Sequence, residues 1–392
     1  MSVPASLWWM RGSAAAFVMA LPLILAGSAC EIDEGGLPET AGSDRRIVTE
    51  PVDAAADLPG ADGPAVPDGP DLGDDSGTPP VDGDDQVDDA ADDGSPVVDA
   101  GSPEADAGDT GPLLCQHCAN YGTPRTLGTI PQVIKELSGL AASTRNPGVL
   151  YAHNDSGDSA RFFAIGETAA LLGEMDLPGA TNIDWEDIAV GTCPAGSCVY
   201  LADTGDNDVK REQYKIYRVA EPATFPGAGG TMNVTYEQFP FVYPDGSHNA
   251  ETLLVHPQTG RVFIVLKEAG IPATVYEMPL PLQADKVVTV VKVGSLSVPA
   301  SAGLVTGGSF HPCGDRVLIR TKQGLYELGS TQSGDVTSVF SAPATAVPVA
   351  VEVQGEAVEY APDGLRYFTS SETGGGPTPL LSVVECLSAA RR

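Results

Sequence analysis

Acidic residues recur at one position of a pattern that repeats along the chain after residue 130. In four of the five copies a glutamate stands at the opening of a short apolar run, and in all five a second run, reached through a turn, ends in polar or charged side chains. The opening glutamates, which are the metal-ligand candidates, are Glu136, Glu186, Glu251 and Glu356. The ligand-binding candidates at the ends of the second runs are Asn154, Asp155, Asp203, Asp206, Lys267 and Arg320. Calcium takes oxygen ligands from Glu, Asp and Asn, so the pattern predicts a metal or ligand site.

The charges of these residues allow two interpretations. Four carboxylates close together cannot all stay ionised without compensation. A calcium ion would supply it, with the glutamates as ligands. Alternatively, Lys267 and Arg320, together with backbone N–H groups, neutralise the acids as structural ion pairs. The residue types leave both interpretations open.

Short β-rich runs separated by turn residues fill residues 113–392, which is typical of an all-β domain. Each repeat holds the two runs described above and usually two more, which predicts five blades of four strands, a five-bladed β-propeller. The first two runs of the five units span residues 136–155, 184–207, 250–268, 306–321 and 355–372. The later runs are predicted at residues 162–166 and 171–177, 214–219 and 232–243, 275–280 and 287–293, 325–328 and 336–342, and 380–385. The alternatives are a six-bladed ring with an irregular blade near residues 294–304, and a two-sheet sandwich.

The direction of the strands decides which of these side chains meet. If the first strand of each blade begins at the ring axis on one face, the second strand returns to that face. The glutamates and the polar endings would then share one axial mouth. The fifth unit lacks a fourth strand, whereas the run Thr123–Ile130 precedes the first unit. We expect this N-terminal run to be the outer strand of the last blade, which closes the ring and covers a sheet edge.

The N-terminal third carries the signals for location. Residues 1–29 are predicted to be an export signal, because Arg11 precedes an apolar stretch that ends in small residues before Cys30. Small residues directly before a cysteine resemble the lipobox of bacterial lipoproteins, which implies a lipid anchor at Cys30; cleavage after Ala29 without lipidation is the alternative. Residues 30–112 are predicted to be a disordered tether, since residues 31–112 hold 24 acidic residues, two arginines and no aromatic residue.

Six cysteines follow Cys30, and an even number in an exported chain favours disulfides. Cys193 and Cys198 flank a four-residue turn and are expected to pair. The remaining four, which the ring would bring to one corner, are Cys115, Cys118, Cys313 and Cys386. Cys115 and Cys118 are expected to pair with Cys313 and Cys386 in either assignment. The alternative for Cys115 and Cys118 is a pair of thiols that binds a metal. The sequence has no second CxxC motif and no nearby histidine cluster that would support it.

The first copy, Glu136-Leu-Ser-Gly-Leu140, and the matching glutamates resemble secreted propellers of the esterase-like or phytase-like kind, and more distantly the gluconolactonase and regucalcin type. The resemblance covers about residues 127–386. It implies a metal or ligand in the axial mouth, calcium held by acidic side chains and, in enzymatic members, a phosphate or ester substrate. The fourth unit departs from the pattern, because Thr306-Gly307-Gly308 stands in place of the acid. The positive Lys267 and Arg320 would suit an anionic ligand.

Composition excludes some classes of function. The chain has 21 Lys and Arg against 53 Asp and Glu, so it lacks the basic surface of a nucleic-acid-binding protein. No apolar run of about 20 residues follows residue 30, which predicts no membrane-spanning helix in the mature chain. We therefore expect a monomeric, lipid-anchored protein of the cell envelope, facing the periplasm or the cell surface, that binds a small ligand or a protein partner through its axial mouth. The alternative function is calcium-assisted hydrolysis of phosphoesters or esters.

Overall fold

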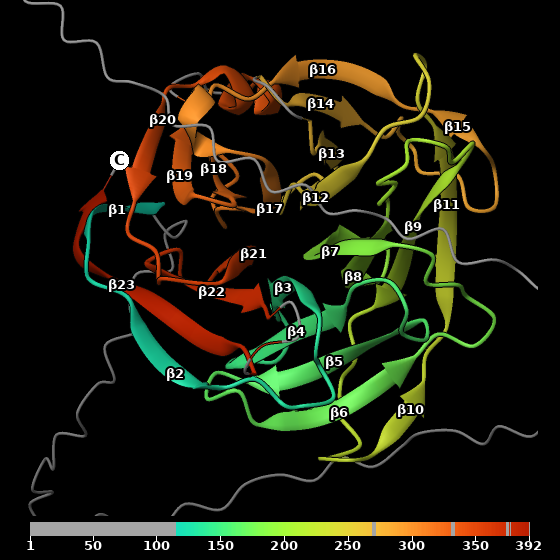
Figure 1. Ribbon diagram of the computed structural model, residues 1–392, viewed down its shortest axis with the longest axis horizontal. Helices are drawn as coiled ribbons and strands as arrows, with labels where there is room; N and C mark the ends of the chain where they lie inside the picture. Colours follow the sequence, from blue (N-terminus) through green and yellow to red (C-terminus); the bar gives the residue numbers. More distant parts are fainter. Residues whose placement is uncertain (1–114, 269–271, 331–333, 374–375, 377, 392) are drawn as a thin grey trace, which may run out of the picture. The chain divides into compact units, whose positions relative to one another are not determined.

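The computed structural model contains five β-sheets arranged as a ring (Figure 1). It describes residues 115–391 except 269–271, 331–333, 374–375 and 377. The predicted export signal, the tether and Cys30 lie outside the described residues. The predicted five-bladed β-propeller is confirmed for the described part of the chain.

Each blade has its first strand at the ring axis and its later strands progressively farther out. Blade 1 consists of β3 (Leu137–Ala142), β4 (Val149–Asn154), β5 (Arg161–Gly166) and β6 (Leu171–Asp176). Blade 2 consists of β7 (Trp185–Cys193), β8 (Gly196–Asp203), β9 (Tyr214–Ala220) and β11 (Tyr236–Val242). Blade 3 consists of β12 (Ala250–Val255), β13 (Val262–Leu266), β14 (Thr274–Glu277) and β16 (Val291–Ser295). Blade 4 consists of β17 (Val305–Phe310), β18 (Arg316–Thr321), β19 (Gly324–Gly329) and β20 (Ala344–Val347).

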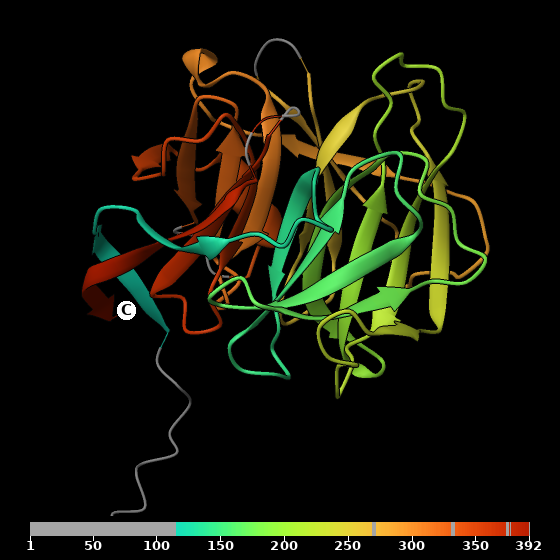
Figure 2. The same cartoon turned by 60° about the horizontal axis from the view of Figure 1, so that its bottom comes forward.

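Blade 5 is built from both ends of the described chain. Its strands are β21 (Gln354–Tyr360), β22 (Arg366–Glu372), β23 (Leu380–Arg391), β1 (Gln116–Tyr121) and β2 (Arg125–Thr129). Both β1 and β2 pair antiparallel with the long strand β23, and Figure 2 shows them at one side of the ring. The predicted closure by an N-terminal run is therefore confirmed, with two strand segments, β1 and β2, in place of the single predicted one.

The innermost strands β3, β7, β12, β17 and β21 contact one another in succession around the axis. They are buried on both faces, which explains why their sequences are runs of apolar and small residues without alternation; every residue of β3, β12 and β17 is buried. The six-bladed alternative and the sandwich are both wrong. The segment that a sixth blade would have used contains only the end of β16 and a short 3-10 helix, η1 (Ala300–Ala302).

Two blades carry an additional strand on their outer edge. The connection between β9 and β11 contributes β10 (Thr231–Asn233), which pairs parallel to β6 of blade 1. The connection between β14 and β16 contributes β15 (Val288–Thr289), which pairs parallel to β11 of blade 2. The continuous runs predicted at residues 232–243 and 287–293 are thus each split between two blades, because the crossing segment covers an otherwise exposed sheet edge.

The predicted fourth strand of blade 4, at residues 336–342, is wrong. This segment is the 3-10 helix η2 (Val336–Ser341), and the outer strand is β20, which follows it. The side chain of Asp335 accepts a hydrogen bond from the backbone N–H of Thr337 and so begins the helix. Val339 and Phe340 are fully buried between blades 3 and 4. A buried apolar pair is compatible with either structure, so the local sequence did not distinguish them.

Histidines join neighbouring blades on the face opposite the starts of the inner strands. His256, which follows β12, has Nε2 3.2 Å from the carbonyl oxygen of Gly314, and His311, which follows β17, has Nε2 3.0 Å from that of Gly364. Both glycines have a positive φ, and a Cβ atom at either would lie 2.4 Å from the imidazole Nε2. Glycine is therefore required in these turns both for the backbone conformation and for the close approach of the ring.

The predicted pair and the predicted group of four cysteines both form disulfides, three bonds in all. Cys193 pairs with Cys198 within blade 2. The open assignment is decided as Cys115–Cys313 and Cys118–Cys386. The first bond joins the segment just before β1 to blade 4, and the second joins β1 to β23 within blade 5.

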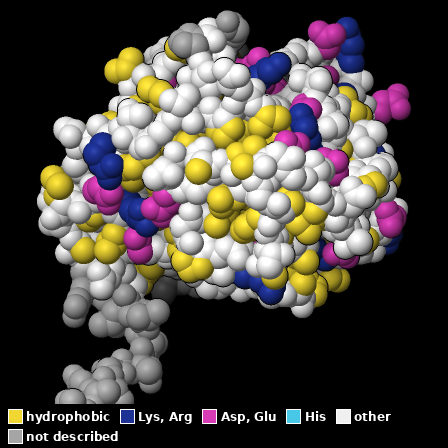
Figure 3. All heavy atoms as spheres, turned by 90° about the horizontal axis from the view of Figure 1, so that it is seen from below, with side chains coloured by type: hydrophobic (Ala, Val, Ile, Leu, Met, Phe, Trp, Pro, Cys, Tyr) yellow, Lys and Arg dark blue, Asp and Glu magenta, His cyan; other side chains and the backbone are white. Residues whose placement is uncertain are grey.

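Charged side chains on the side of the ring seen in Figure 3 lie in small groups of both signs. One ion pair of the domain joins Arg161 to Glu174, at 2.8 Å. Within the described residues, no helix is long and apolar enough to cross a membrane.

Candidate functional site

Each inner strand has a β-bulge at the same place, near its first residue. The residue that the bulge leaves unpaired is Ser138, Glu186, Glu251, Thr306 and Glu356 in blades 1 to 5, in that order. Bulges redirect side chains and are frequent beside functional sites. The structural match of Glu186 in blade 1 is therefore Ser138, and the predicted equivalence of Glu136 is wrong by two residues.

The bulged residues have two different roles. The hydroxyl of Ser138 donates to the backbone oxygen of Glu186 at 2.7 Å, and that of Thr306 donates to the backbone oxygen of Gly355 at 2.8 Å. These short side chains thus join blade 1 to blade 2 and blade 4 to blade 5. The three bulged glutamates are buried, with 4–5% of their surface exposed.

We use the term axial mouth for the end of the ring axis at which the inner strands begin. Its acidic residues are Glu136, Asp155, Asp184, Glu186, Glu251, Glu352, Glu356 and Glu372, and its basic residues are Lys267, Arg320 and Lys322. The acids outnumber the bases.

Two of the basic residues have specific acidic partners. Lys267 forms an ion pair with Glu251, and both side chains are largely buried. Arg320 pairs with Glu352 at 2.8 Å rather than with a bulged glutamate. Its guanidinium also donates to the carbonyl oxygen of Gly324. Glu251 is therefore neutralised by a structural ion pair, as one of the two interpretations of the sequence predicted. Neither Lys267 nor Arg320 forms an ion pair with Glu186.

Three carboxylates of the axial mouth lie together. Oxygen atoms of Asp155, Asp184 and Glu186 are within 4.8 Å of one another. Within the described residues the carboxylate of Glu186 has neither a hydrogen bond nor an ion pair. Gly205 borders this group, since a Cβ atom there would lie 2.1 Å from Oε1 of Glu186 and 2.4 Å from Oδ2 of Asp184. A larger residue at position 205 would occupy the space between the two carboxylates.

Burial and mutual repulsion raise the pKa values of these acids. The pKa of Glu186 is well above its usual value because the group is desolvated and lies near Asp155 and Asp184. Desolvation, followed by repulsion from Asp155, raises the pKa of Asp184 to about 6. Desolvation, followed by repulsion from Glu356, raises the pKa of Glu372 to about 8. A cation bound among these acids would stabilise their ionised forms and lower their pKa values.

Other predicted site residues make contacts within the protein. The side chain of Asn154 accepts from the N–H of Glu136 and donates to Asp158 at 2.6 Å. Asp203 is fully buried and pairs with Arg211 at 2.9 Å. Asp206 accepts hydrogen bonds from the N–H groups of Lys210 and Arg211 and from the hydroxyl of Tyr214. Asn154, Asp203 and Asp206 thus hold the loops around the mouth, and their predicted ligand contacts stay predictions.

Four residues of the mouth were not among the candidates predicted from the sequence: Asp184, Glu352, Glu372 and Gly205. Asp184 stands two residues before the bulged Glu186, and Glu372 ends the second strand of blade 5, where the repeat places a polar residue. The repeat could therefore have predicted Glu372, which stands at its polar position. Gly205 and Glu352 lie in connections, whose paths the repeat does not specify.

Below the mouth, two further acids, the buried Asp187 and the partly buried Glu359, join neighbouring blades. Asp187 accepts hydrogen bonds from the N–H groups of Ile188 and Leu253, which links blade 2 to blade 3. Glu359 accepts from the N–H of Ala142 at 3.0 Å, which links blade 5 to blade 1. Burial raises the pKa of Glu359 to about 8 and that of Asp187 well above its usual value.

The stability of the domain is expected to fall as the pH rises from about 4.5 to about 8, partly because of Glu359. In this range the folded state keeps a proton on Glu359 that the unfolded chain releases, and each unit of pKa difference corresponds to ~1.4 kcal/mol. Glu359→Gln keeps the acceptor oxygen and cannot ionise, so its melting temperature should fall less over this range. The exposed Glu385→Gln serves as control and should follow the wild type. Equal slopes for Glu359→Gln and wild type would contradict this assignment.

No model of a known protein family matches the sequence, and no curated protein matches it. Among solved structures, a gluconolactonase of Xanthomonas campestris is similar at 11% identity with a TM-score of 0.36, over 70% of this chain and 99% of that chain. A Bacteroides uniformis protein assigned to the 6-phosphogluconolactonases is similar at 14% identity with a TM-score of 0.32, over 59% of this chain and 63% of that chain, less than two thirds of its length. A nidogen/laminin complex is similar at 14% identity with a TM-score of 0.33, over 61% of this chain and 73% of that chain. Likeness at this level carries no inference about activity.

Proposed function

We propose that the protein is a binding module that holds a divalent cation, calcium, in its axial mouth. The observation that carries the proposal is the group of three carboxylates. Oxygen atoms of Asp155, Asp184 and Glu186 lie within 4.8 Å of one another, and the largely buried Glu186 has no hydrogen bond or ion pair among the described residues. Three carboxylates this close repel one another unless a cation compensates their charge.

The three residues fit such an ion. All their donor atoms are carboxylate oxygens, which calcium prefers. Gly205 keeps the space between Asp184 and Glu186 free of a side chain. Calcium takes about 6–8 oxygen ligands, so three carboxylates leave coordination positions for water or for an oxygen of a second ligand. That second ligand is the small molecule or protein partner of the binding module.

Calcium at millimolar concentration should raise the melting temperature of the wild type by several degrees. A ligand that binds only the folded state stabilises it by ~2.7 kcal/mol at a hundredfold excess over Kd. Glu186→Gln should lose this shift, because it removes one charge from the three-carboxylate group. Glu356→Gln is the matched control, since Glu356 is a bulged glutamate of blade 5 outside the group and the variant should keep the shift. A wild type that responds neither to calcium nor to a chelator would rule out the proposal.

Metal-assisted hydrolysis of esters or phosphoesters is the second candidate. It rests on the proposed ion: three carboxylates would leave coordination positions on calcium that a substrate oxygen would take. Against a phosphate substrate, Lys267 and Arg320 are held by Glu251 and Glu352. Purified protein assayed with phosphomonoesters and aryl esters, with and without calcium, separates the two candidates. Calcium-dependent turnover that is lost in Glu186→Gln would favour the hydrolase.

The location of the module is proposed from the sequence alone. An export signal and a lipid on Cys30 would place the propeller on the cell envelope, at the end of an acidic tether that extends by self-repulsion. Cys30→Ser should move the protein from the membrane fraction to the soluble fraction. An unchanged membrane fraction would contradict the anchor.

A further inference from the structure

A second group of metal-ligating side chains lies on the face opposite the axial mouth, where blade 5 meets blade 4. Ligand atoms of Cys115, His117, His311, Cys313 and Asp315 are all within 4.8 Å of one another. Cys115 and Cys313 are 198 residues apart in the chain and meet because the N-terminal segment closes the ring. The fold therefore places two histidines, His117 and His311, beside the cysteine pair Cys115 and Cys313, a proximity that the sequence did not reveal.

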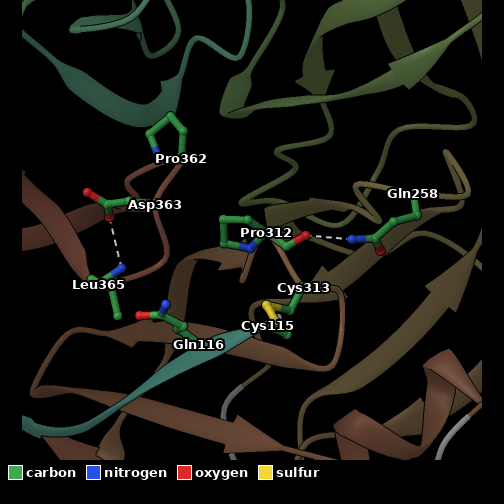
Figure 4. A pocket seen from close by; sticks show the side chains of 8 residues that line it. All are labelled: Cys115, Gln116, Gln258, Pro312, Cys313, Pro362, Asp363 and Leu365. Atoms are coloured by element: carbon green, nitrogen blue, oxygen red, sulfur yellow. Dashed lines mark hydrogen bonds between the residues drawn. A yellow bond between two sulfur atoms is a disulfide. The ribbon is translucent and has the colours of Figure 1, made fainter. Parts of the chain in front are cut away.

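The sulfur atoms of this group are reachable from solvent. Cys115 and Cys313, joined as a disulfide, line a hollow of about 820 Å³ together with Gln116 and Pro312 (Figure 4). The other bond near the N-terminus, Cys118–Cys386, links β1 to β23 within blade 5. The strand pairing that closes the ring therefore has its own covalent support when the first bond is opened.

We propose that reduction of Cys115–Cys313 turns this junction into a structural zinc site, with two thiolates, His117 Nε2 and the Asp315 carboxylate as ligands. The reductant is a dithiol: it gives two electrons to the S–S bond, which breaks into two cysteine thiols, and the dithiol closes to its own disulfide. Zinc then displaces one proton from each thiol, because the thiolate is the ligand.

One existing distance already matches a zinc site, and a second, now a hydrogen bond, would have to lengthen by about 0.5 Å. His117 Nε2 lies 3.7 Å from Cys115 Sγ and 2.8 Å from Asp315 Oδ1. Bond lengths of about 2.3 Å for Zn–S and about 2.0 Å for Zn–N place neighbouring ligands of a tetrahedral ion about 3.5 Å apart. His117 is buried, and its ring packs against that of His311 at 4.9 Å, so the ligand is already held in place.

His311 is not one of the four ligands. Its Nδ1 accepts a hydrogen bond from the N–H of Cys313 at 3.1 Å, and its Nε2 lies 3.0 Å from the carbonyl oxygen of Gly364. The remaining four side chains complete a closed tetrahedral site. Two thiolates and an imidazole favour zinc, whereas the oxygen ligands of the axial mouth favour calcium, so the two sites select different ions.

The test uses the full chain with Cys193→Ser and Cys198→Ser, and a parallel chain that also carries Cys118→Ser and Cys386→Ser, so that no other disulfide can supply thiols on reduction. After reduction with a phosphine, zinc binding is measured by competition with a chromophoric chelator, and cobalt is added in parallel to detect thiolate-to-metal absorption. We expect one zinc per reduced chain, none in the oxidised chain, and a cobalt spectrum of a tetrahedral site with thiolate ligands. Near-ultraviolet circular dichroism of the reduced, zinc-bound chain should match that of the oxidised chain.

Three variants identify the ligands. His117→Asn and Asp315→Asn should each weaken zinc binding at least tenfold while the oxidised protein keeps its native circular dichroism. Cys115→Ser with Cys313→Ser should abolish binding. Unchanged zinc affinity in His117→Asn would overturn the proposal. So would a reduced chain that binds no zinc, or one that unfolds and is not restored by zinc.

Discussion

A chain that lacks residues 113–130 is expected to lose the entire propeller fold, although the deletion removes only the outer part of one blade. It takes away β1 and β2, which pair along the length of β23. It also removes Ile130, which is buried in the core between blades 5 and 1. Without them β23 is an unpaired edge and the ring is open between its first and last blades. Far- and near-ultraviolet circular dichroism of the deleted chain should show no cooperative thermal transition.

Two controls separate strand pairing from other effects of this deletion. A chain without residues 31–112 should keep the wild-type melting temperature, since the predicted tether contributes no core. A full-length chain with Cys115, Cys118, Cys313 and Cys386 changed to Ser keeps both strands and loses both disulfides; it should be less stable, by ~2–5 kcal/mol per bond, yet still unfold cooperatively. If the deletion of 113–130 behaved like the deletion of 31–112, closure of the ring by the N-terminus would not be needed for folding.

Lys267→Met should destabilise the domain by ~3–5 kcal/mol at neutral pH, the usual cost of breaking a buried ion pair on one side. Lys267 is the ion-pair partner of Glu251, and its charge also favours the ionised forms of Glu186 and Glu356. Its removal leaves Glu251 buried and unpaired among other acids. The free energy of unfolding, measured with urea, gives the effect.

A double variant distinguishes the loss of the charge pair from a loss of packing. Lys267→Met with Glu251→Met removes both charges, and replacing a whole buried pair by apolar residues is often neutral or stabilising. The double variant should therefore recover most of the stability lost in Lys267→Met, which a double-mutant cycle expresses as a coupling free energy. A double variant as unstable as the single variant would show that the lysine stem, rather than its charge, is what the fold requires.

Much of the architecture follows from local sequence. The repeated order of apolar runs and turn residues determines that the chain forms short strands in five similar units. The missing fourth strand of the last unit and the surplus run before the first predict closure by the N-terminus, which β1 and β2 confirm. These features are readable because strand patterns and turn chemistry depend on residues close in sequence.

Tertiary structure decided the details on which chemistry depends. Only the bulge register shows that Ser138, and not Glu136, matches Glu186. Only the fold assigns Lys267 to Glu251 and Arg320 to Glu352, and only the closed ring pairs Cys115 with Cys313 beside His117. The physical reason is common to all three. A one-residue bulge or the path of a connecting loop redirects a side chain by several ångströms, and ion pairs, disulfides and metal sites depend on such distances between residues far apart in sequence.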